Sequence, residues 1–427
     1  MFDTMLPLLY NYSMKHLRAY KYRIYPTAKQ RKQLAKEFGC ARVIWNKALE
    51  LRTSAWTQDK TRHNYVSLSR VVTAWKDDLP WLREATASCL TQVLIDQDKA
   101  FQHFFRRVKA GEKPGYPKFK SKHGKQAVRY CLDQRRLDAQ YQAGKLLKLP
   151  KLGAVKVKWS RLPIGTPKMV TVSKDTGDRY FVSFSCEEEI DALPLTGKAA
   201  GVDLGVKDVV VTSDGYKSGN PKHLKARLRH LKRQQRRLSR MTKGSNRRAK
   251  QKRRVAKIHA KIANSRADFL HKTTTKLIQE NDAVALEDLN VKGMTRNPHM
   301  ASAVNDVGMH ELRRQIEYKA RWYGRHVEVI DRWAPTSKMC HECGAINENM
   351  PKGLRGLRIR DWTCACGAHH DRDVNGAKNI LKFSTLGNRG IDARGQGKNL
   401  PVSAGTLDES RTEAEQITVA DRLERAA

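Results

Sequence analysis

The fold of this 427-residue chain follows most directly from residues 199–215, which read Ala-Ala-Gly-Val-Asp-Leu-Gly-Val-Lys-Asp-Val-Val-Val-Thr-Ser-Asp-Gly. Two apolar runs joined by a glycine-containing bend predict two successive strands. Asp203 lies in the first strand, between apolar neighbours. A single acid beside a strand is usually a cap or a solvated strand end, so its meaning depends on the other acids of the chain.

Two further acids lie at the ends of predicted elements. Residues 282–289 predict a buried strand that ends in two acids, Glu287 and its neighbouring competitor Asp288. Asp373 opens a short predicted helix, with Asp371 as its competitor. Each of these acids is weak evidence by itself, and the order in which they occur is more specific.

The elements follow one another in a recognisable order. After the strand with Asp203 and its partner come basic helices, the strand with Glu287, a helix at about 307–323, a strand at 326–330 and the helix with Asp373. This α/β order predicts an RNase H-like nuclease core, in which a mixed sheet brings the three acids to one end.

Three clustered carboxylates in a basic chain repel one another unless a hard cation neutralises them. Two Mg²⁺ ions about 3.5–4 Å apart are the usual solution, because they polarise a scissile phosphate, activate a water and stabilise the leaving oxygen. Asp203, Glu287 and Asp373 are therefore the candidate catalytic and magnesium-binding residues.

The composition indicates a polyanionic partner. The chain holds 83 Lys and Arg against 43 Asp and Glu, a formal net charge of +40, so it repels itself unless a polyanion such as nucleic acid binds. A mean hydropathy of −0.67, with no long apolar run, excludes an integral membrane protein. Because the amino terminus lacks a secretory signal, we expect a cytoplasmic protein.

The positive charge is concentrated in residues 222–266, which hold 19 Lys and Arg and no Asp or Glu. Leucines and isoleucines recur at helical spacing on both sides of Lys243-Gly-Ser-Asn, so the tract predicts a helical hairpin with a cationic face. A charge run is usually a solvated face, but this one is unbalanced. The candidate phosphate contacts are Arg233, Arg236, Arg237, Arg240 and Arg266.

The amino-terminal half mixes strands and helices. Alternation predicts strands at 17–25 and within 146–186, and helical periodicity predicts helices from about 28 and at 85–109. We expect a small antiparallel barrel that the helices interrupt.

A loop at 111–125 combines prolines, lysines and aromatics, and cannot be a regular element. Basic residues interleaved with aromatics favour a loop that follows a nucleic-acid backbone and stacks on bases, against the alternative of a solvated linker. Its candidate nucleic-acid contacts are Tyr116, Lys118, Phe119 and Lys120.

Four of the eight cysteines form a compact pattern, Cys340-x-x-Cys343 and Cys364-x-Cys366. Four thiolates at this spacing predict a structural zinc ribbon. The second pair is one residue short of the usual C-x-x-C, so His369 or His370 is an alternative ligand.

Taken together, these motifs resemble a known family, TnpB. They are Gly201-Val-Asp-Leu-Gly, Leu286-Glu-Asp-Leu-Asn, Thr336-Ser-Lys-Met-Cys-His-Glu-Cys-Gly, Trp362-Thr-Cys-Ala-Cys-Gly and Asp371-Arg-Asp-Val-Asn-Gly-Ala-Lys-Asn-Ile. TnpB proteins are insertion-sequence-encoded, RNA-guided DNA endonucleases that resemble ancestors of type V CRISPR effectors. The chain departs from the family in its short second knuckle, an amino-terminal extension and Gly376, where Ala is usual.

The resemblance implies roles for the residues that match. Asp203, Glu287 and Asp373 would be the RuvC catalytic acids, and Cys340, Cys343, Cys364 and Cys366 the zinc ligands. The partners would be a guide RNA derived from the transposon end and double-stranded target DNA beside a short flanking motif, with a monomer favoured and no membrane. The host would be bacterial or archaeal, and the protein nucleoid-associated.

We expect the chain to divide into an extension (1–15), a wedge-like β-barrel (16–30 and 126–196), a helical recognition insertion (31–125), a RuvC-like core (197–335) with a basic hairpin (222–279), a zinc ribbon (336–370), a final RuvC segment (371–386) and a disordered tail (387–427).

Two other functions use the same residues. A nuclease-inactive, RNA-guided DNA-binding repressor would lack one or more acids, and all three are present. A transposase joining strands directly would use the same acids. The guide RNA, the flanking motif and the cut positions cannot be deduced from the sequence.

Overall fold

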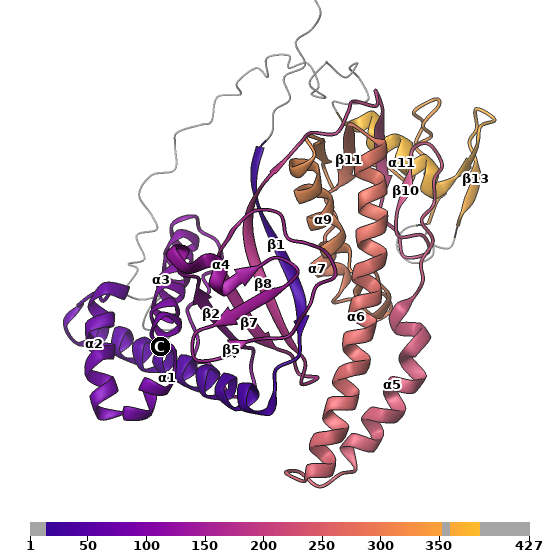
Figure 1. Ribbon diagram of the computed structural model, residues 1–427. Helices are drawn as coiled ribbons and strands as arrows, with labels where there is room; N and C mark the ends of the chain where they lie inside the picture. The colour runs from indigo at the N-terminus through magenta and orange to yellow at the C-terminus, as the bar shows by residue number, and fades with distance from the viewer. Residues whose placement is uncertain (1–13, 352–358, 385–427) are drawn as a thin grey trace, which may run out of the picture. The chain divides into compact units, whose positions relative to one another are not determined.

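The computed structural model describes residues 14–351 and 359–384 (Figure 1). The expected disordered tail and residues 1–13 of the expected extension lie outside these residues. The contacts divide the chain into two compact units. Residues 17–188 make up the amino-terminal unit, and the described residues of the carboxy-terminal unit are 14–16, 189–351 and 359–384.

The amino-terminal unit contains a five-stranded sheet in the order β2-β7-β8-β1-β6. Within it, the pairs β2–β7, β7–β8 and β1–β6 are antiparallel. Along β1, Tyr20, Tyr22 and Ile24 are buried, whereas the basic residues between them face outward. The predicted alternation of this strand is therefore confirmed. The strands are β1 (Met14–Ile24), β2 (Gln126–Cys131), β6 (Val157–Lys158), β7 (Pro167–Lys174) and β8 (Tyr180–Ile190).

A small three-stranded sheet accompanies it, formed by β3 (Tyr141–Gln142), β4 (Leu146–Leu149) and β5 (Gly153–Ala154). Just before it come two short helical turns, η2 (Gln134–Arg136) and α4 (Leu137–Gln140). One hydrophobic core runs through both sheets and the helices of this unit.

The helices of the amino-terminal unit are α1 (Ala28–Asp59), α2 (Tyr65–Asp78), the short η1 (Pro80–Glu84) and α3 (Ala87–Lys109). A capping box begins α1, since Gln30 N donates to Thr27 Oγ1 (3.3 Å) and Thr27 N donates to Gln30 Oε1 (2.9 Å). Helix α2 was not predicted. Only Leu68 and Val72 are buried along it, so its apolar stripe is too narrow to stand out in the sequence.

The carboxy-terminal unit is built on a four-stranded sheet in the order β10-β9-β11-β12. Strands β9 (Ala199–Asp203), β11 (Ala283–Glu287) and β12 (His326–Ile330) are parallel, and β10 (Val211–Thr212) is antiparallel to β9. Strand β11 is buried from Ala283 to Leu286. Its continuous apolar run therefore reflects a central strand of a mixed sheet.

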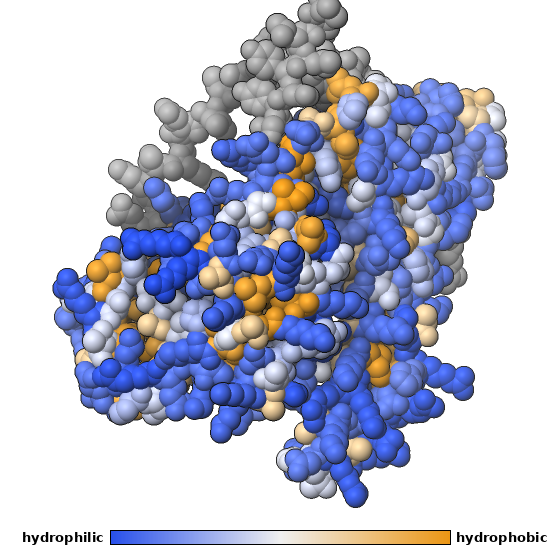
Figure 2. All heavy atoms as spheres, in the orientation of Figure 1, coloured by the Kyte–Doolittle hydropathy of each residue, from blue (hydrophilic) through white to orange (hydrophobic). Residues whose placement is uncertain are grey.

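The helices of this unit are α5 (His223–Ser239), α6 (Asn246–Glu280), α7 (Val291–Met294), α8 (Ala301–Val307), α9 (Met309–Trp322) and α11 (Arg372–Phe383). The predicted basic hairpin is confirmed as α5 and α6, and Figure 2 shows its hydrophilic surface. The predicted helix at 307–323 starts later, because Gly308 has a φ of 76° and separates α8 from α9. No helix in the described ranges is long and apolar enough to cross a membrane.

Candidate active site and cysteine cluster

Strands β9 and β11 bring Asp203 and Glu287 to one edge of the sheet. In their parallel register Val202 pairs with Leu286, so the two acids follow as the next residues of neighbouring strands. The buried apolar run of each strand ends just before its acid, and both acids are half-buried. The predicted placement of these two acids at one end of a mixed sheet is therefore observed.

Helix α11 brings the third acid to the same place. Gly201 allows the close approach of α11 to β9, because a Cβ there would lie 2.0 Å from the carbonyl oxygen of Ala377. On the same helix, a Cβ on Gly376 would lie 3.8 Å from Cγ of Asp203, which is ordinary contact. An alanine at position 376 would therefore fit beside the Asp203 carboxylate.

The acids influence one another electrostatically. Burial and the negative charges of Asp373 and Glu287 raise the pKa of Asp203 to about 7. Burial, with the neighbouring Asp288, also raises the pKa of Glu287. Carboxylates are the donors that Mg²⁺ takes in proteins, so the residue types present match the predicted cation.

The three carboxylates are nevertheless spread more widely than a filled metal site. Among the described residues, the cysteine group is the one set of three or more possible ligands whose atoms all lie within 4.8 Å of one another. Arg360 partly explains the spread, since its Nη1 donates to both carboxylate oxygens of Asp373, at 3.2 and 3.1 Å. A guanidinium thus neutralises one acid of the trio.

The two competing acids have other partners. Asp371 is the N-cap of α11, accepting from the backbone N–H groups of Asp373 (3.1 Å) and Val374 (3.0 Å), and its carboxylate pairs with Lys217 at 2.5 Å. Asp288 pairs with Arg313 at 2.8 Å and with Arg332. These partners lower the pKa of Asp288. Both competitors thus orient neighbouring groups and are less suited to bind a cation.

A pocket of about 440 Å³ lies beside Glu287. Strongly basic side chains line it, together with His310, and Asp288 holds two of them in place. Local sequence patterns do not reveal this set, because its members come from α7, α9 and the segment after β12. The basic residues are Lys292, Arg313, Arg314 and Arg332.

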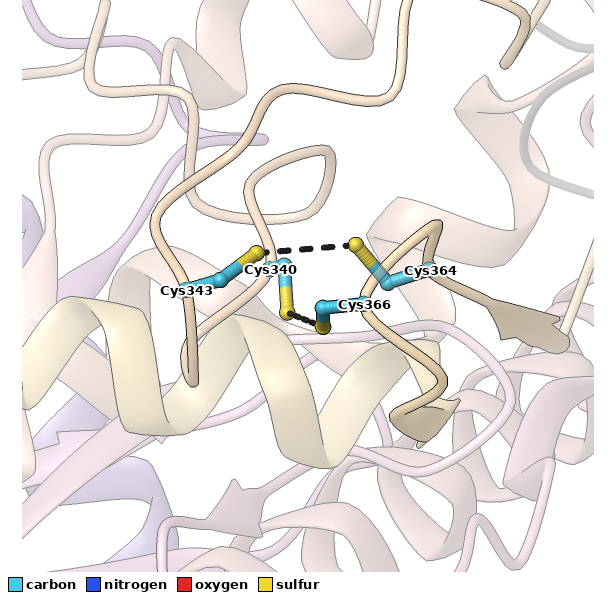
Figure 3. A group of neighbouring side chains, drawn as sticks. All are labelled: Cys340, Cys343, Cys364 and Cys366. Atoms are coloured by element: carbon cyan, nitrogen blue, oxygen red, sulfur yellow. Dashed lines mark hydrogen bonds between the residues drawn. The ribbon is translucent and has the colours of Figure 1, made fainter.

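The four cysteine sulfurs converge, as Figure 3 shows. Cys340 Sγ lies 3.8 Å from Cys366 Sγ, and Cys343 Sγ lies 3.6 Å from Cys364 Sγ. Tetrahedral zinc with Zn–S bonds of about 2.3 Å places its sulfurs about 3.8 Å apart. The short C-x-C pair therefore reaches the cluster, and the residues present fit a zinc ion.

The two histidines considered as alternative ligands have other roles. His370 is buried, and its Nε2 lies 3.0 Å from Cys340 Sγ, a hydrogen-bonding contact to the cluster. His369 Nδ1 lies 3.1 Å from Thr363 Oγ1, across the β13–β14 hairpin (Asp361–Thr363 and His369–Asp371). A partner of this kind orients a ligating sulfur without binding the metal itself.

Two asparagines of α11 connect the cysteine cluster to the acids. Asn375 Nδ2 donates to the carbonyl oxygen of Met339 (2.8 Å), and its Oδ1 accepts from the backbone of His341 (3.0 Å). Asn379 Nδ2 donates to the carbonyl oxygens of Thr336 (2.8 Å) and Met339 (2.6 Å). Both side chains are fully buried. They were not predicted, although polar residues four apart on a buried helix face are the available signal.

The loop with the predicted nucleic-acid contacts is attached to α1. Trp45 Nε1 donates to the carbonyl oxygen of Lys118 (2.9 Å), and Lys120 Nζ lies 3.5 Å from the centre of the Trp45 ring. Phe119 is 63% exposed. Tyr116 instead packs inward, with its hydroxyl 2.9 Å from Thr53 Oγ1. Of the predicted set, Tyr116 thus packs inward, Lys118 and Phe119 face outward, and Lys120 is exposed but lies over Trp45.

The predicted phosphate contacts on the basic hairpin also differ from one another in their exposure to solvent. Arg233, Arg236, Arg237 and Arg240 are on α5 and at its end, where most of this basic face is exposed. Arg266 is half-buried on α6, and its Nη2 lies 3.5 Å from Asp306 Oδ1. Asp306 in turn accepts from the backbone of Leu224 and caps α5 from a distant segment. The structure therefore gives Arg266 an intramolecular partner.

Three family models match the chain. "Probable transposase" (OrfB_IS605) matches residues 183–298, "Cas12f1-like, TNB domain" matches 310–380 and "Helix-turn-helix domain" matches 14–61. The last description does not fit the structure, in which residues 28–59 form one uninterrupted helix.

Two of the similar proteins align with most of the chain, and a third aligns with a shorter part. A "Putative RNA-guided DNA endonuclease" of Streptomyces pristinaespiralis is 42% identical over 85% of this chain and 88% of its own length. The Escherichia coli K12 protein "Putative RNA-guided DNA endonuclease InsQ" is 32% identical over 86% of this chain and 92% of its own. The "TnpB-like protein MJ0751" of Methanocaldococcus jannaschii is 33% identical over 27% of this chain and 42% of its own length.

The fold also matches a solved structure, the cryo-EM structure of the Cas12f1–sgRNA–target DNA complex. The TM-score is 0.54 with 14% identity, over 86% of this chain and 98% of that one. At this identity the likeness shows a common fold. The relatives that align along most of its length show that the chain belongs to the TnpB family.

Proposed function

We propose that this protein is an RNA-guided DNA endonuclease of a transposable element. The observation that carries the proposal is the gathering of Asp203, Glu287 and Asp373 at one sheet edge, where burial and the charges of the other two acids raise the pKa of Asp203. The family supports it, since relatives aligned over most of the chain carry that name. The reaction is hydrolysis of a DNA phosphodiester beside a short flanking motif.

The three acids would hold Mg²⁺. When bound, the cation supplies Lewis-acid polarisation of the scissile phosphate and a water of lowered pKa. Arg360 must release Asp373 for that carboxylate to become a ligand. The basic pocket beside Glu287 would bind phosphates of the substrate strand, and Asp288 would hold Arg313 and Arg332 in position for this.

The finer fold assignments belong to the same proposal. The four-stranded sheet with its helices would be a RuvC-type, RNase H-like core, and residues 336–370 a zinc ribbon bound through the four cysteines. The five-stranded sheet would be a wedge-like barrel, with the helices at 31–125 as its recognition insertion. Guide RNA supplies sequence specificity by base pairing, and the protein reads the flanking motif.

The test begins with purification from cells that carry the element's own transposon end, followed by sequencing of the co-purifying RNA. The complex is then incubated with Mg²⁺ and a plasmid that bears the guide match behind a randomised flank. We expect guide-dependent cuts that vanish in Asp203→Ala and persist in Asp268→Ala, because Asp268 is an acid of α6 that pairs with Lys272. Bound RNA and DNA without cuts would favour the repressor. Strand-transfer products without RNA would favour the transposase.

A further inference from the structure

The helical part of the amino-terminal unit contains a second pocket, of about 280 Å³, which neither the proposed cleavage nor the cysteine cluster uses. It lies between the last turns of α1, the start of α2, the end of α3 and the loop that carries Tyr116. Its lining combines aromatic rings with arginines. These residues include Arg52, Trp56, Arg62, Phe101, Phe105 and Tyr116.

The aromatic side chains form a connected wall. The Phe101 and Phe105 rings stack with centres 6.4 Å apart, and Phe101 meets the edge of Tyr116 at 5.6 Å. Phe105 is 54% exposed. Exposure of this aromatic face to water does not stabilise the fold. The face is able to stack on a planar ligand.

The rim of the pocket is cationic. The guanidinium of Arg62 lies 5.1 Å from the centre of the Trp56 ring, and Lys60 Nζ lies 5.5 Å from it. Neither cation has a carboxylate partner among the described residues, and both are exposed. An anion that followed the aromatic ligand would therefore meet two unneutralised charges.

A buried arginine completes the pocket. Arg52 is 9% exposed, lies 5.2 Å from the Phe101 ring centre and pairs with Asp98. Its Nε has no hydrogen-bond partner among the described residues, although it is buried. Asp98 also accepts from the backbone of Tyr65 (2.8 Å) and so fixes the start of α2 against the pocket. Arg52 thus forms a fixed, charged base of the pocket.

From these features we infer that the pocket binds one unstacked nucleobase of a single strand, with the adjoining phosphate on Lys60 and Arg62. An aromatic wall and flanking cations are together the chemistry that binds a base with its phosphate. The inference rests on the proposed function, because it assumes that nucleic acid is the partner. The base comes either from guide RNA or from a displaced DNA strand.

The test uses the full-length chain and a single-stranded oligoadenylate of about 15 nucleotides that carries one 2-aminopurine. Stacking in the pocket quenches the fluorescence of 2-aminopurine. Phe105→Leu keeps an apolar side chain but removes the aromatic face, and we expect about tenfold weaker binding. Phe105→Trp restores the face and binds within about twofold of the parent chain. Trp81→Leu is the matched control, since Trp81 is exposed but lies outside the pocket.

A ribose and a deoxyribose version of the probe distinguish the two sources of the base. Tighter binding of the RNA probe assigns the pocket to guide RNA, and equal or tighter binding of the DNA probe assigns it to the displaced strand. Unchanged affinity and quenching in Phe105→Leu would overturn the inference. If the protein binds the probe normally in every variant and still cuts DNA, the proposed function stands and the pocket assignment fails.

Discussion

At the scale of single residues, neighbouring acids have opposite surroundings. Glu287 ends a buried strand, and burial together with the neighbouring charge of Asp288 raises its pKa, whereas Asp288 turns to two arginines that lower its pKa. The same chemical group is thus suited to bind a cation at one position and to orient guanidinium groups at the next.

The first prediction compares these two acids. Glu287→Gln should reduce guided DNA cleavage by more than the roughly 10–100-fold expected for loss of an outer partner, because it removes a carboxylate of the trio. Asp288→Asn should stay within that range, since Arg313 and Arg332 remain present but less well held. Cleavage rates at saturating Mg²⁺ provide the measurement. Equal losses in the two variants would contradict the assignment.

The second prediction concerns Lys319 on α9. Its side chain is 5% exposed, and Nζ donates to the carbonyl oxygen of His271 (2.8 Å) and to Thr275 Oγ1 (2.7 Å). Burial lowers its pKa from 10.5 to about 8. Between these values the unfolded chain holds a proton that the folded chain lacks, so folding stability should rise with pH across this window.

Lys319→Met removes that titration. The free energy of unfolding of the parent chain, minus that of the variant, should increase by roughly 3 kcal/mol between about pH 8 and 10.5. Denaturant unfolding at a series of pH values measures it. Parallel stability curves would show that Lys319 titrates normally in the folded protein.

At the scale of elements, the helix that carries Asp373 packs directly on the strand that carries Asp203. A Cβ at position 201 would lie 2.0 Å from the Ala377 carbonyl oxygen and 2.6 Å from the Leu381 nitrogen, both backbone atoms. Glycine is therefore required for this packing, and the distance between the acids depends on it.

The third prediction is that Gly201→Ala destabilises the protein by about 1–3 kcal/mol, the usual cost of overpacking, and slows cleavage through displacement of α11. Gly39→Ala is the matched control. It lies within α1 with no atom within 4 Å of its added Cβ, so it should be neutral or slightly stabilising. Denaturant unfolding and cleavage assays on both variants test this, and a neutral Gly201→Ala would refute the packing argument.

The fourth prediction concerns zinc. Because Asn375 and Asn379 bind α11 to the backbone beside Cys340, loss of the metal should loosen α11 as well as the cysteine loops. Removal of zinc with a chelator should therefore lower amide hydrogen-exchange protection in residues 372–383, and zinc should restore it.

Asn379→Leu removes the hydrogen bonds that Asn379 makes from α11 to the backbone beside Cys340 and leaves the four cysteines unchanged. With zinc bound, it leaves the Thr336 and Met339 carbonyl groups without this donor and should cost about 1–3 kcal/mol. Its exchange pattern in α11 should resemble that of the metal-free chain, whereas the cysteine loops stay protected. If chelation changes only the cysteine loops, α11 is independent of the cluster.

At the scale of the whole molecule, a net charge of +40 makes electrostatic attraction to phosphates the largest contribution to nucleic-acid binding. Each phosphate contact releases counterions, so the logarithm of the affinity falls with the logarithm of the salt concentration. The slope falls in magnitude by about 0.7–0.9 for each contact that is lost.

The fifth prediction follows for the exposed arginines of α5. An Arg236→Ala/Arg237→Ala double variant should bind the co-purifying RNA more weakly and reduce the salt slope by about one to two. Lys272→Ala is the control, because that cation is paired with Asp268 at 2.8 Å on α6. Filter-binding titrations at several salt concentrations give the slopes. An unchanged slope in the double variant would mean that this face does not contact phosphates.

Much of this architecture could be predicted from local sequence patterns. Continuous apolar runs predicted β9 and β11, and the spacing of leucines around Lys243-Gly-Ser-Asn predicted the hairpin α5–α6. The spacing of the cysteines predicted the cluster. These features depend on residues close together in the chain, where periodicity and spacing carry the information.

The remaining features were decided by contacts between distant residues, which local patterns do not encode. Asp306 caps a helix 82 positions away, Arg360 neutralises Asp373, and the aromatic pocket joins α1, α3 and a loop. Tertiary packing also assigned Tyr116 to the pocket wall and Arg266 to an internal partner. Residue types and spacing therefore determined which chemistry is available, and packing determined which charges meet and which stay free.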